Sequence, residues 1–257
     1  MAVRKKRDTQ EIAVQALSTT RLEAYILGTT PFIYHAMSSK DKRELILPKV
    51  KVTGKARETT AKHDVMTEYR SSFYTSSAAK PKTRLVLPSV MFKASMSSAA
   101  LDLPDVNKSL VGRLLWVEGD EVEFYGIPEM LIKTVRNSGF PPTPDMRTRP
   151  IVREWACKIA VSFVSPMFKR AAVVNLLAAA GIIRGVGDWR TEKGSGNYGS
   201  FKLVGENDRA WNKIIKASTV AAQDAAIEEP GYYDNETREM YEWYAAEALR
   251  REFKVAK

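Results

Sequence analysis

The feature that most constrains the fold of this chain is an alternating run of residues from position 151 to 164. Apart from Arg153, every odd position from Ile151 to Phe163 is apolar, and the even positions are mixed in character. A period of two residues is typical of a β-strand with one face in the core. We therefore predict one long strand over 151–164, which requires a sheet at the centre of the fold.

The residues that follow this strand predict a helix. Ser165 and Pro166 are suited to the N-cap and the first helical position, and the pattern continues to Ala180. Gly181 is a natural end for such a helix.

Further elements come from the same kind of periodicity. Alternation predicts strands at 21–28 and 198–204, helical spacing predicts a helix at 90–101, and 113–117 with 122–125 predicts a β-hairpin. The order of these elements predicts an α+β fold with a ferredoxin-like or RNA-recognition-motif-like sheet. That fold supports many functions, so it does not identify one.

Three segments lie outside this predicted domain of residues 20–204. Residues 1–19 predict a basic N-terminal arm, 38–84 a long basic insertion, and 205–257 a helical C-terminal extension. The last helix, with Asp234 or Asn235 as its cap, is predicted to pack on the domain or, alternatively, to mediate oligomerisation.

Charge favours a polyanionic partner. Forty Lys and Arg face thirty Asp and Glu, which gives a net charge of +10. An anionic membrane surface and simple solubility are the alternatives. The insertion alone has twelve basic and five acidic residues, so it is interpreted as a mobile loop that grips a nucleic-acid backbone or is merely solvated. The basic residues proposed for backbone contact are Lys49, Lys51, Lys55 and Arg57.

Other features exclude several classes of protein. Cys157 is the only cysteine, and His35 and His63 are the only histidines, so we expect no internal disulfide, no metal site and no cofactor. No apolar stretch reaches the roughly 20 residues of a membrane span, and the basic N-terminus lacks the apolar core of a signal peptide. We expect a cytoplasmic protein with no membrane partner and no small-molecule substrate.

The stretch from 181 to 199 is the strongest candidate for a binding site. It has six glycines in nineteen residues, which permit positive φ angles and close approach of the backbone to a ligand. Its glycines follow a predicted helix and precede a predicted strand, which is the wrong context for a dinucleotide-binding fingerprint. A tight turn without a ligand is the alternative. Arg184, Arg190 and Lys193 are predicted to contact phosphates, and Trp189 and Tyr198 to stack on bases.

Two motifs resemble the RAMP superfamily, which includes the backbone subunits of CRISPR effector complexes. The first combines Gly-Val-Gly-Asp-Trp-Arg at 185–190 with Gly-Asn-Tyr-Gly-Ser-Phe at 196–201, between a helix and a last strand. The second, Pro-Ser-Val-Met-Phe-Lys at 88–93, resembles the family's proline-serine-x-x-x-lysine helix start. The chain also resembles uncharacterised RAMP-like proteins of bacteriophages.

The resemblance implies a single-stranded DNA or RNA partner, side-by-side self-association along the strand, and a setting such as phage DNA replication or recombination. It also implies a backbone contact at the lysine of the second motif and ligand contacts within the glycine-rich loop. The residues carried over in this way are Lys93, Gly185, Gly187, Arg190, Tyr198 and Gly199.

Two alternatives come from other classes. A metal-independent endoribonuclease would use His35, with Asp41 beside it, or His63 with Asp64, for general acid–base catalysis. A structural or interaction protein would instead use the helix of residues 235–254.

The five tryptophans are interpreted by context. Trp116 and Trp155 are predicted to lie in the core, and Trp211 and Trp243 to pack in the helical extension. Trp189 is predicted to be exposed for stacking.

Overall fold

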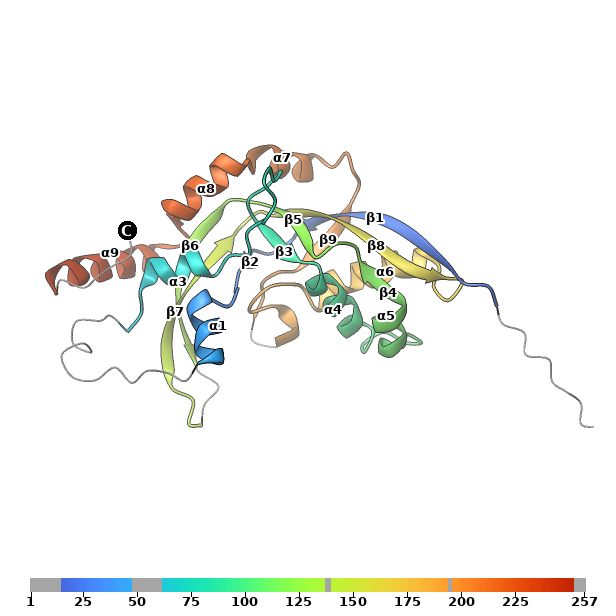
Figure 1. Ribbon diagram of the computed structural model, residues 1–257, viewed down its shortest axis with the longest axis horizontal. Coiled ribbons are helices and arrows are strands. Elements are labelled where there is room, and N and C mark those ends of the chain that lie inside the picture. Colours follow the sequence, from blue (N-terminus) through green and yellow to red (C-terminus); the bar gives the residue numbers. More distant parts are fainter. Residues whose placement is uncertain (1–14, 48–61, 137–139, 194–195, 252–257) are drawn as a thin grey trace, which may run out of the picture.

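A computed structural model describes residues 15–47, 62–136, 140–193 and 196–251, which form a mixed α+β fold on a six-stranded and a four-stranded sheet (Figure 1). Residues 1–14 of the predicted arm lie outside the described residues. So do four of the proposed contact residues, which are Lys49, Lys51, Lys55 and Arg57.

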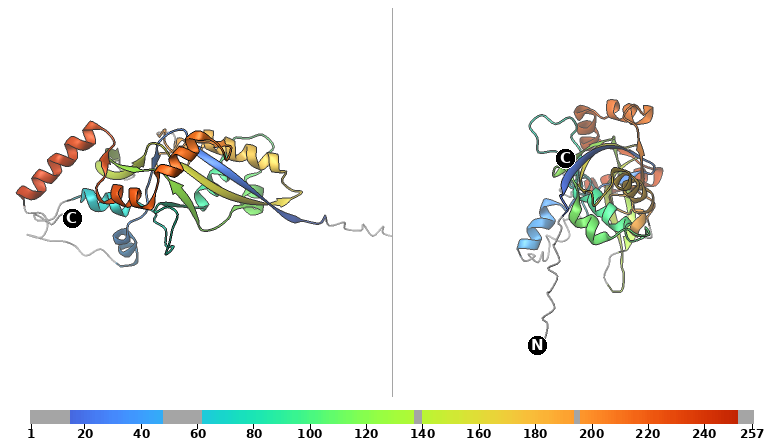
Figure 2. Two further views of the ribbon diagram at one scale, coloured as in Figure 1. Left: turned by 90° about the horizontal axis from the view of Figure 1, so that it is seen from above. Right: turned by 90° about the vertical axis from the view of Figure 1, so that its right-hand side faces the viewer.

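The large sheet is antiparallel and strongly curled (Figure 2). Its strand β1 begins at Ser18, so the end of the predicted arm already belongs to the sheet. The mixed α+β arrangement is consistent with the ferredoxin-like or RNA-recognition-motif-like plan predicted from the sequence. The strand order is β3 (Val86–Pro88), β5 (Glu121–Tyr125), β8 (Ala156–Ser165), β1 (Ser18–Gly28) and β9 (Phe201–Val204), and β4 (Leu115–Val117) also pairs with β8.

Strands β4 and β5 do not form the predicted hairpin. Both pair antiparallel with β8, β4 through Leu115 opposite Phe163 and β5 through Phe124 opposite Cys157. They are thus successive parts of one edge, separated by a turn at 118–120. Alternation identified the strands, but it contains no information on their partners.

The predicted long strand is also divided. Strand β7 (Pro144–Val152) ends before Arg153, and β8 begins at Ala156. Trp155 in the interruption is completely buried, and its indole N–H donates to the carbonyl of Thr30 at 2.8 Å. The chain therefore bends at Trp155 and leaves one sheet for the other.

The small sheet contains a long hairpin. Its strands, in order, are β10 (Gly231–Tyr232), β6 (Pro128–Arg136), β7 and β2 (Phe32–Ile33). Strands β6 and β7 pair antiparallel from Pro128 opposite Val152 to Arg136 opposite Pro144. This hairpin projects from the rest of the molecule (Figure 1).

Helices cover both faces of the large sheet. On one face lie α4 (Val90–Ala99), as predicted, with α5 (Lys108–Leu114) and α6 (Arg170–Ile183); on the other lies α7 (Arg209–Ala217) (Figure 1). Helix α6 differs from its prediction because Ser165 is the last residue of β8, and the helix has no side-chain cap. Gly181 lies inside α6, where a Cβ atom would be 2.2 Å from the carbonyl oxygen of Phe201. It is glycine for close packing and does not end the helix.

Part of the predicted insertion belongs to the core. It contains α1 (Ser39–Ile46) and α3 (Val65–Ser71), and α3 buries Val65, Met66 and Tyr69. Residues 65–73 are therefore not part of a solvated loop, although their polar residues obscured the apolar face of this short helix, whereas residues 75–82 are mostly exposed.

The C-terminal extension packs along the domain. Helix α8 (Val220–Glu228) buries Gln223 completely, and α9 (Asn235–Arg250) packs on β6. Asp234 caps α9 as predicted, because its carboxylate accepts from the N–H of Thr237. Within the described residues, no helix is both long and apolar enough to cross a bilayer.

Candidate nucleic-acid interface

The glycine loop, defined here as residues 184–199, is held against the segment that joins β1 to β2. The N–H of Asp188 donates to Ile33 (3.0 Å), and that of Gly199 donates to Pro31 (2.8 Å). A further bond from Val186 to the carbonyl of Gly199 (2.9 Å) closes the loop on itself. The described residues of the loop, 184–193 and 196–199, are therefore an ordered part of the domain surface.

The glycines of the loop meet the chain's own atoms. Gly185, Gly187 and Gly199 all have positive φ angles. A Cβ atom at Gly199 would lie 1.7 Å from the carbonyl oxygen of Val186, and one at Gly187 would lie 2.6 Å from the ring of Phe32. The tight-turn alternative thus accounts for these glycines, and close approach to a ligand is not needed to explain them.

The two arginines of the loop are paired with carboxylates. Arg184 binds Asp102, and Arg190 binds Glu192 at 2.6 Å. Burial opposes ionisation of Glu192, but hydrogen bonds from Ser98 and Arg190 outweigh it and lower its pKa. Both arginines are thus engaged by carboxylates in this structure, and their predicted contacts with phosphates stay a prediction.

Two lysines remain available. Lys193 is exposed and Lys93 on α4 is half-buried, and neither has an ion-pair partner among the described residues. The two motifs that carry these lysines lie side by side, since residues of α4 and of the glycine loop line the same cavity of about 200 Å³. It is lined by Val90, Met91, Ala94, Ser95, Gly185, Val186, Gly187 and Arg190.

Three half-exposed aromatic rings form a group that we name the aromatic platform: Trp189, Tyr198 and Tyr233. They pack on one face of the small sheet, over Ile33, Leu131 and Ile151. The rings of Trp189 and Tyr198 are 6.3 Å apart and tilted by 49°. Trp189 is thus less exposed than predicted, because its ring packs against this apolar cluster of the sheet.

The sequence did not identify Tyr233 or its neighbour Arg153. The guanidinium of Arg153 lies 4.1 Å from the centre of the Tyr233 ring and binds Glu129 at 2.8 Å. The available signal was Arg153 itself, the one charged residue in the apolar series of the predicted strand.

The histidines have other partners than those predicted. His35 Nδ1 lies 3.1 Å from Asp188 Oδ2 in the glycine loop, rather than beside Asp41. Burial opposes ionisation of Asp188, but hydrogen bonds from His35 and the N–H of Trp189, with the charge of Arg149, lower its pKa.

His63 lies between two carboxylates. Its ring nitrogens are 2.5 Å from Glu68 and 2.9 Å from Asp145. Asp64, the predicted partner, instead caps α3 through the N–H of Thr67.

The remaining tryptophans divide differently from the prediction. Trp155 is buried as predicted, Trp116 is only half-buried, and the indole of Trp211 donates to the carbonyl of Cys157. Trp243 is 61% exposed, so the prediction that it packs in the extension is wrong.

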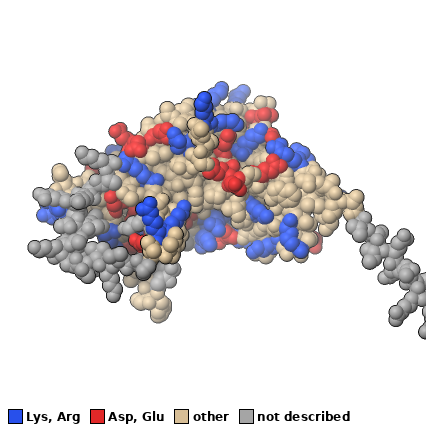
Figure 3. All heavy atoms as spheres, viewed as in Figure 1, with Lys and Arg blue, Asp and Glu red and all other residues tan. Residues whose placement is uncertain are grey.

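Charge on the visible surface is mixed. On the face shown in Figure 3, Lys and Arg lie among Asp and Glu and do not form one continuous patch. Among the described residues, no group of three or more His, Cys, Asp or Glu side chains is placed to hold a metal ion.

Comparison with known proteins gives little. No family model matches the chain, and no curated protein matches it. Among solved structures, Cmr6 from Pyrococcus furiosus is similar over 73% of this chain and 98% of its own, with a TM-score of 0.36 and 9% identity. A similarity at this level identifies neither a family nor a function.

Proposed function

We propose that this protein binds single-stranded nucleic acid across the glycine loop and the aromatic platform. The observation that carries the proposal is the platform itself, with three half-exposed rings on a rigid sheet. The same loop that supplies Trp189 and Tyr198 also supplies the unpaired Lys193, and Lys93 lies on the helix beside it. Rings and cations are therefore within reach of one strand.

The chemistry favours single strands over duplexes. Bases can stack on protein rings only when they are unstacked from one another, and each such contact contributes about 1–3 kcal/mol. The lysines supply a sequence-independent attraction to phosphates, which the net charge of +10 supports at longer range. Because the loop arginines are bound to carboxylates, we assign the phosphate contacts to the lysines.

Fluorescence anisotropy with labelled single-stranded DNA, single-stranded RNA and duplex DNA over a salt series tests this proposal. We expect tighter binding to a single strand than to the duplex, with a logarithmic salt slope of about 0.7 per phosphate contact. Equal affinity for duplex and single strands, or no binding at low salt, contradicts the proposal. The preferred strand distinguishes handling of DNA from handling of RNA.

Two variants separate the electrostatic and the stacking contributions to nucleic-acid binding. Lys93→Ala combined with Lys193→Ala should reduce the salt slope by about 1.4, which corresponds to two lost phosphate contacts. Tyr198→Ala should weaken binding about 5- to 150-fold and leave the slope unchanged. Lys216→Ala, on α7 at the face of the large sheet opposite α4, is the control for loss of charge. Tyr25→Ala, on β1 in the large sheet, is the control for loss of a tyrosine.

A second function, RNA cleavage without a metal ion, is favoured by the pair His35 and Asp188. The carboxylate beside Nδ1 holds the imidazole tautomer in which Nε2 is an acceptor. The His35 side chain is half-exposed, and Nε2 has no partner among the described residues. An exposed base held by a carboxylate is suited to remove a proton from a ribose hydroxyl.

The proposed step is an internal transfer. The 2′-oxygen attacks the adjacent phosphorus while its proton passes to Nε2 of His35. The bond from phosphorus to the 5′-oxygen breaks, and that oxygen takes a proton from water. The products are a 2′,3′-cyclic phosphate and a 5′-hydroxyl, after which the imidazolium returns its proton to solvent.

Cleavage of labelled RNA in the presence of a chelator tests this second function. We expect a cyclic phosphate end, and we expect His35→Ala to abolish cleavage while the anisotropy-measured affinity is retained. His63→Ala should cleave normally, because His63 is held between Glu68 and Asp145. Intact RNA with the wild-type protein, or equal cleavage by His35→Ala, refutes the assignment without affecting the binding proposal.

A further inference from the structure

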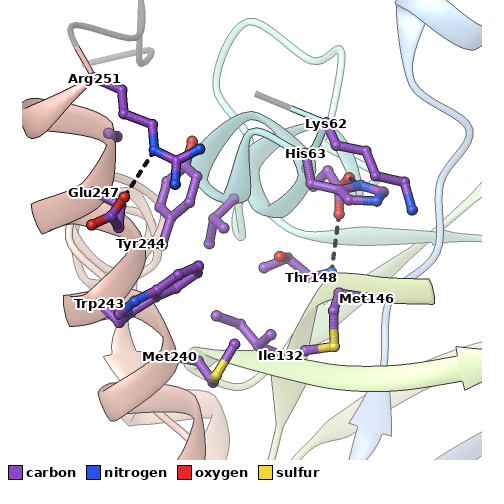
Figure 4. A pocket seen from close by; sticks show the side chains of 13 residues that line it. Lys62, His63, Ile132, Met146, Thr148, Met240, Trp243, Tyr244, Glu247 and Arg251 are labelled. Atoms are coloured by element: carbon purple, nitrogen blue, oxygen red, sulfur yellow. Dashed lines mark hydrogen bonds and ion pairs between the residues drawn. The ribbon is translucent and has the colours of Figure 1, made fainter. Parts of the chain in front are cut away.

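An apolar groove, which we name the α9 groove, lies between α3, α9 and the small sheet (Figure 4). Its volume is about 250 Å³, larger than the ~150 Å³ engineered cavity that holds a benzene molecule. The groove lies on the face of α9 that carries Trp243, whose side chain is mostly exposed. The apolar walls are formed by Val65, Ile132, Met146, Met240, Trp243 and Tyr244.

The polar groups at the rim are occupied by one another. Glu68 lies 2.5 Å from Nδ1 of His63 and accepts from the N–H of Thr148 at 3.1 Å. Asp145, beside the groove, lies 2.9 Å from Nε2 of His63 and accepts from Lys62 at 2.7 Å.

At the other end of the α9 groove the polar side chains are also paired with one another, because Glu247 binds Arg251 at 2.8 Å. A ligand with several hydrogen-bonding edges, such as a nucleobase, would find one buried polar group without a partner in the lining, the hydroxyl of Tyr244, and each further edge left unpaired costs about 1–3 kcal/mol. An apolar ring has no such cost, so the groove is best suited to a phenyl group between thioether and indole surfaces.

Among the described residues, one phenyl ring is completely exposed. Phe140, in the connection between β6 and β7, has a relative exposure of 102%, so it does not fill the groove of its own copy. The hairpin of β6 and β7 projects away from α9 (Figure 1). A fully exposed phenyl ring at the end of a projecting hairpin has no role in packing the monomer.

We propose that Phe140 of one copy inserts into the α9 groove of a second copy. We propose a head-to-tail contact, in which each added copy leaves one ring and one groove open and which produces open chains or closed rings. In a two-fold pair the two copies would exchange rings, and association would stop at the dimer. The contact needs no nucleic acid, so its test is independent of the proposed binding function.

Sedimentation velocity of the full chain over a concentration series, without nucleic acid, tests the proposal. We expect concentration-dependent association that Phe140→Ala and Trp243→Ala each weaken at least tenfold. Leu101→Ala, at an exposed apolar residue of another surface, is the matched control and should associate normally. A wild-type protein that remains monomeric, or a Phe140→Ala variant that associates like wild type, overturns the proposal.

Mixing the two variants gives the sharper result. Phe140→Ala retains the groove and Trp243→Ala retains the ring, so an equimolar mixture should form a one-to-one dimer that grows no further. A mixture that stays monomeric although the wild type associates contradicts the head-to-tail arrangement. Both positions are exposed, so we expect both variants to fold, and circular dichroism with thermal unfolding checks this.

Discussion

Replacing Gln223 with leucine tests how firmly the C-terminal extension is joined to the domain. This α8 side chain has no exposed surface and makes five hydrogen bonds to the region of β3 and β5. Its Oε1 accepts three of them and its Nε2 donates the other two. The partners are the Thr83 hydroxyl (2.7 Å), the N–H groups of Arg84 (2.8 Å) and Leu85 (3.2 Å), and the carbonyls of Phe124 (3.2 Å) and Gly126 (3.1 Å).

The expected cost of Gln223→Leu follows from the partners that remain unpaired. Leucine has a similar volume, so packing changes little, and Phe124 keeps its bond from Thr83. The two N–H groups and the carbonyl of Gly126 lose their partner, and each buried unsatisfied group costs about 1–3 kcal/mol. We expect the free energy of unfolding to fall by about 3–5 kcal/mol.

Urea unfolding followed by circular dichroism measures this loss. Asp224→Ala is the control, because its ion pair with Arg84 is partly exposed and should contribute no more than about 1 kcal/mol. A loss below about 1 kcal/mol for Gln223→Leu would refute the reasoning, since it would mean that α8 is not anchored through this side chain.

Three further outcomes are expected. Gly199→Ala should lower the free energy of unfolding by more than about 1 kcal/mol, because the φ of Gly199 is +73° and a Cβ atom would meet a backbone oxygen. Gly205→Ala is the control, since Gly205 has open space around it, and thermal unfolding compares the two variants. The arginines after Glu247 lower its pKa from 4.5 to about 2, so the stabilisation of the end of α9 should be complete above pH 4.5 and be lost as the pH falls through about 2, as a carboxyl NMR titration would show. A pH-independent end of α9 would contradict this. Burial raises the pKa of the Cys157 thiol, so thiol reagents should modify it only after unfolding; rapid labelling of the native protein would show otherwise.

The large sheet was predictable because its signals are local. Alternation located β1 and β8, and helical spacing located α4, since one face of each element lies in the core. Strand partners and bends are not local. The alternation does not distinguish a bend at Trp155 from a continuous strand. A buried apolar residue is expected at position 155 in either case, and here that residue is the one that fixes the bend.

The candidate site was predicted only in part. Gly-rich composition located the loop, and the structure brings it beside the helix of Lys93. The sequence could not show that Glu192 binds Arg190, because the ion pair depends on how the loop folds. Tyr233 joins the aromatic platform from the residues just after β10, far along the chain, which spacing within the loop does not indicate.

The place of β1 has a consequence for how the protein is made on the ribosome. This strand is the first of the described elements to be synthesised, yet Leu27 pairs with Ala156, about 130 residues later, and its other edge pairs with β9. At ~5–20 residues per second, β1 waits roughly 6–26 s for its nearest partner. During that interval both of its edges are open to other chains, so nascent-chain chaperones should affect its yield more than its final stability.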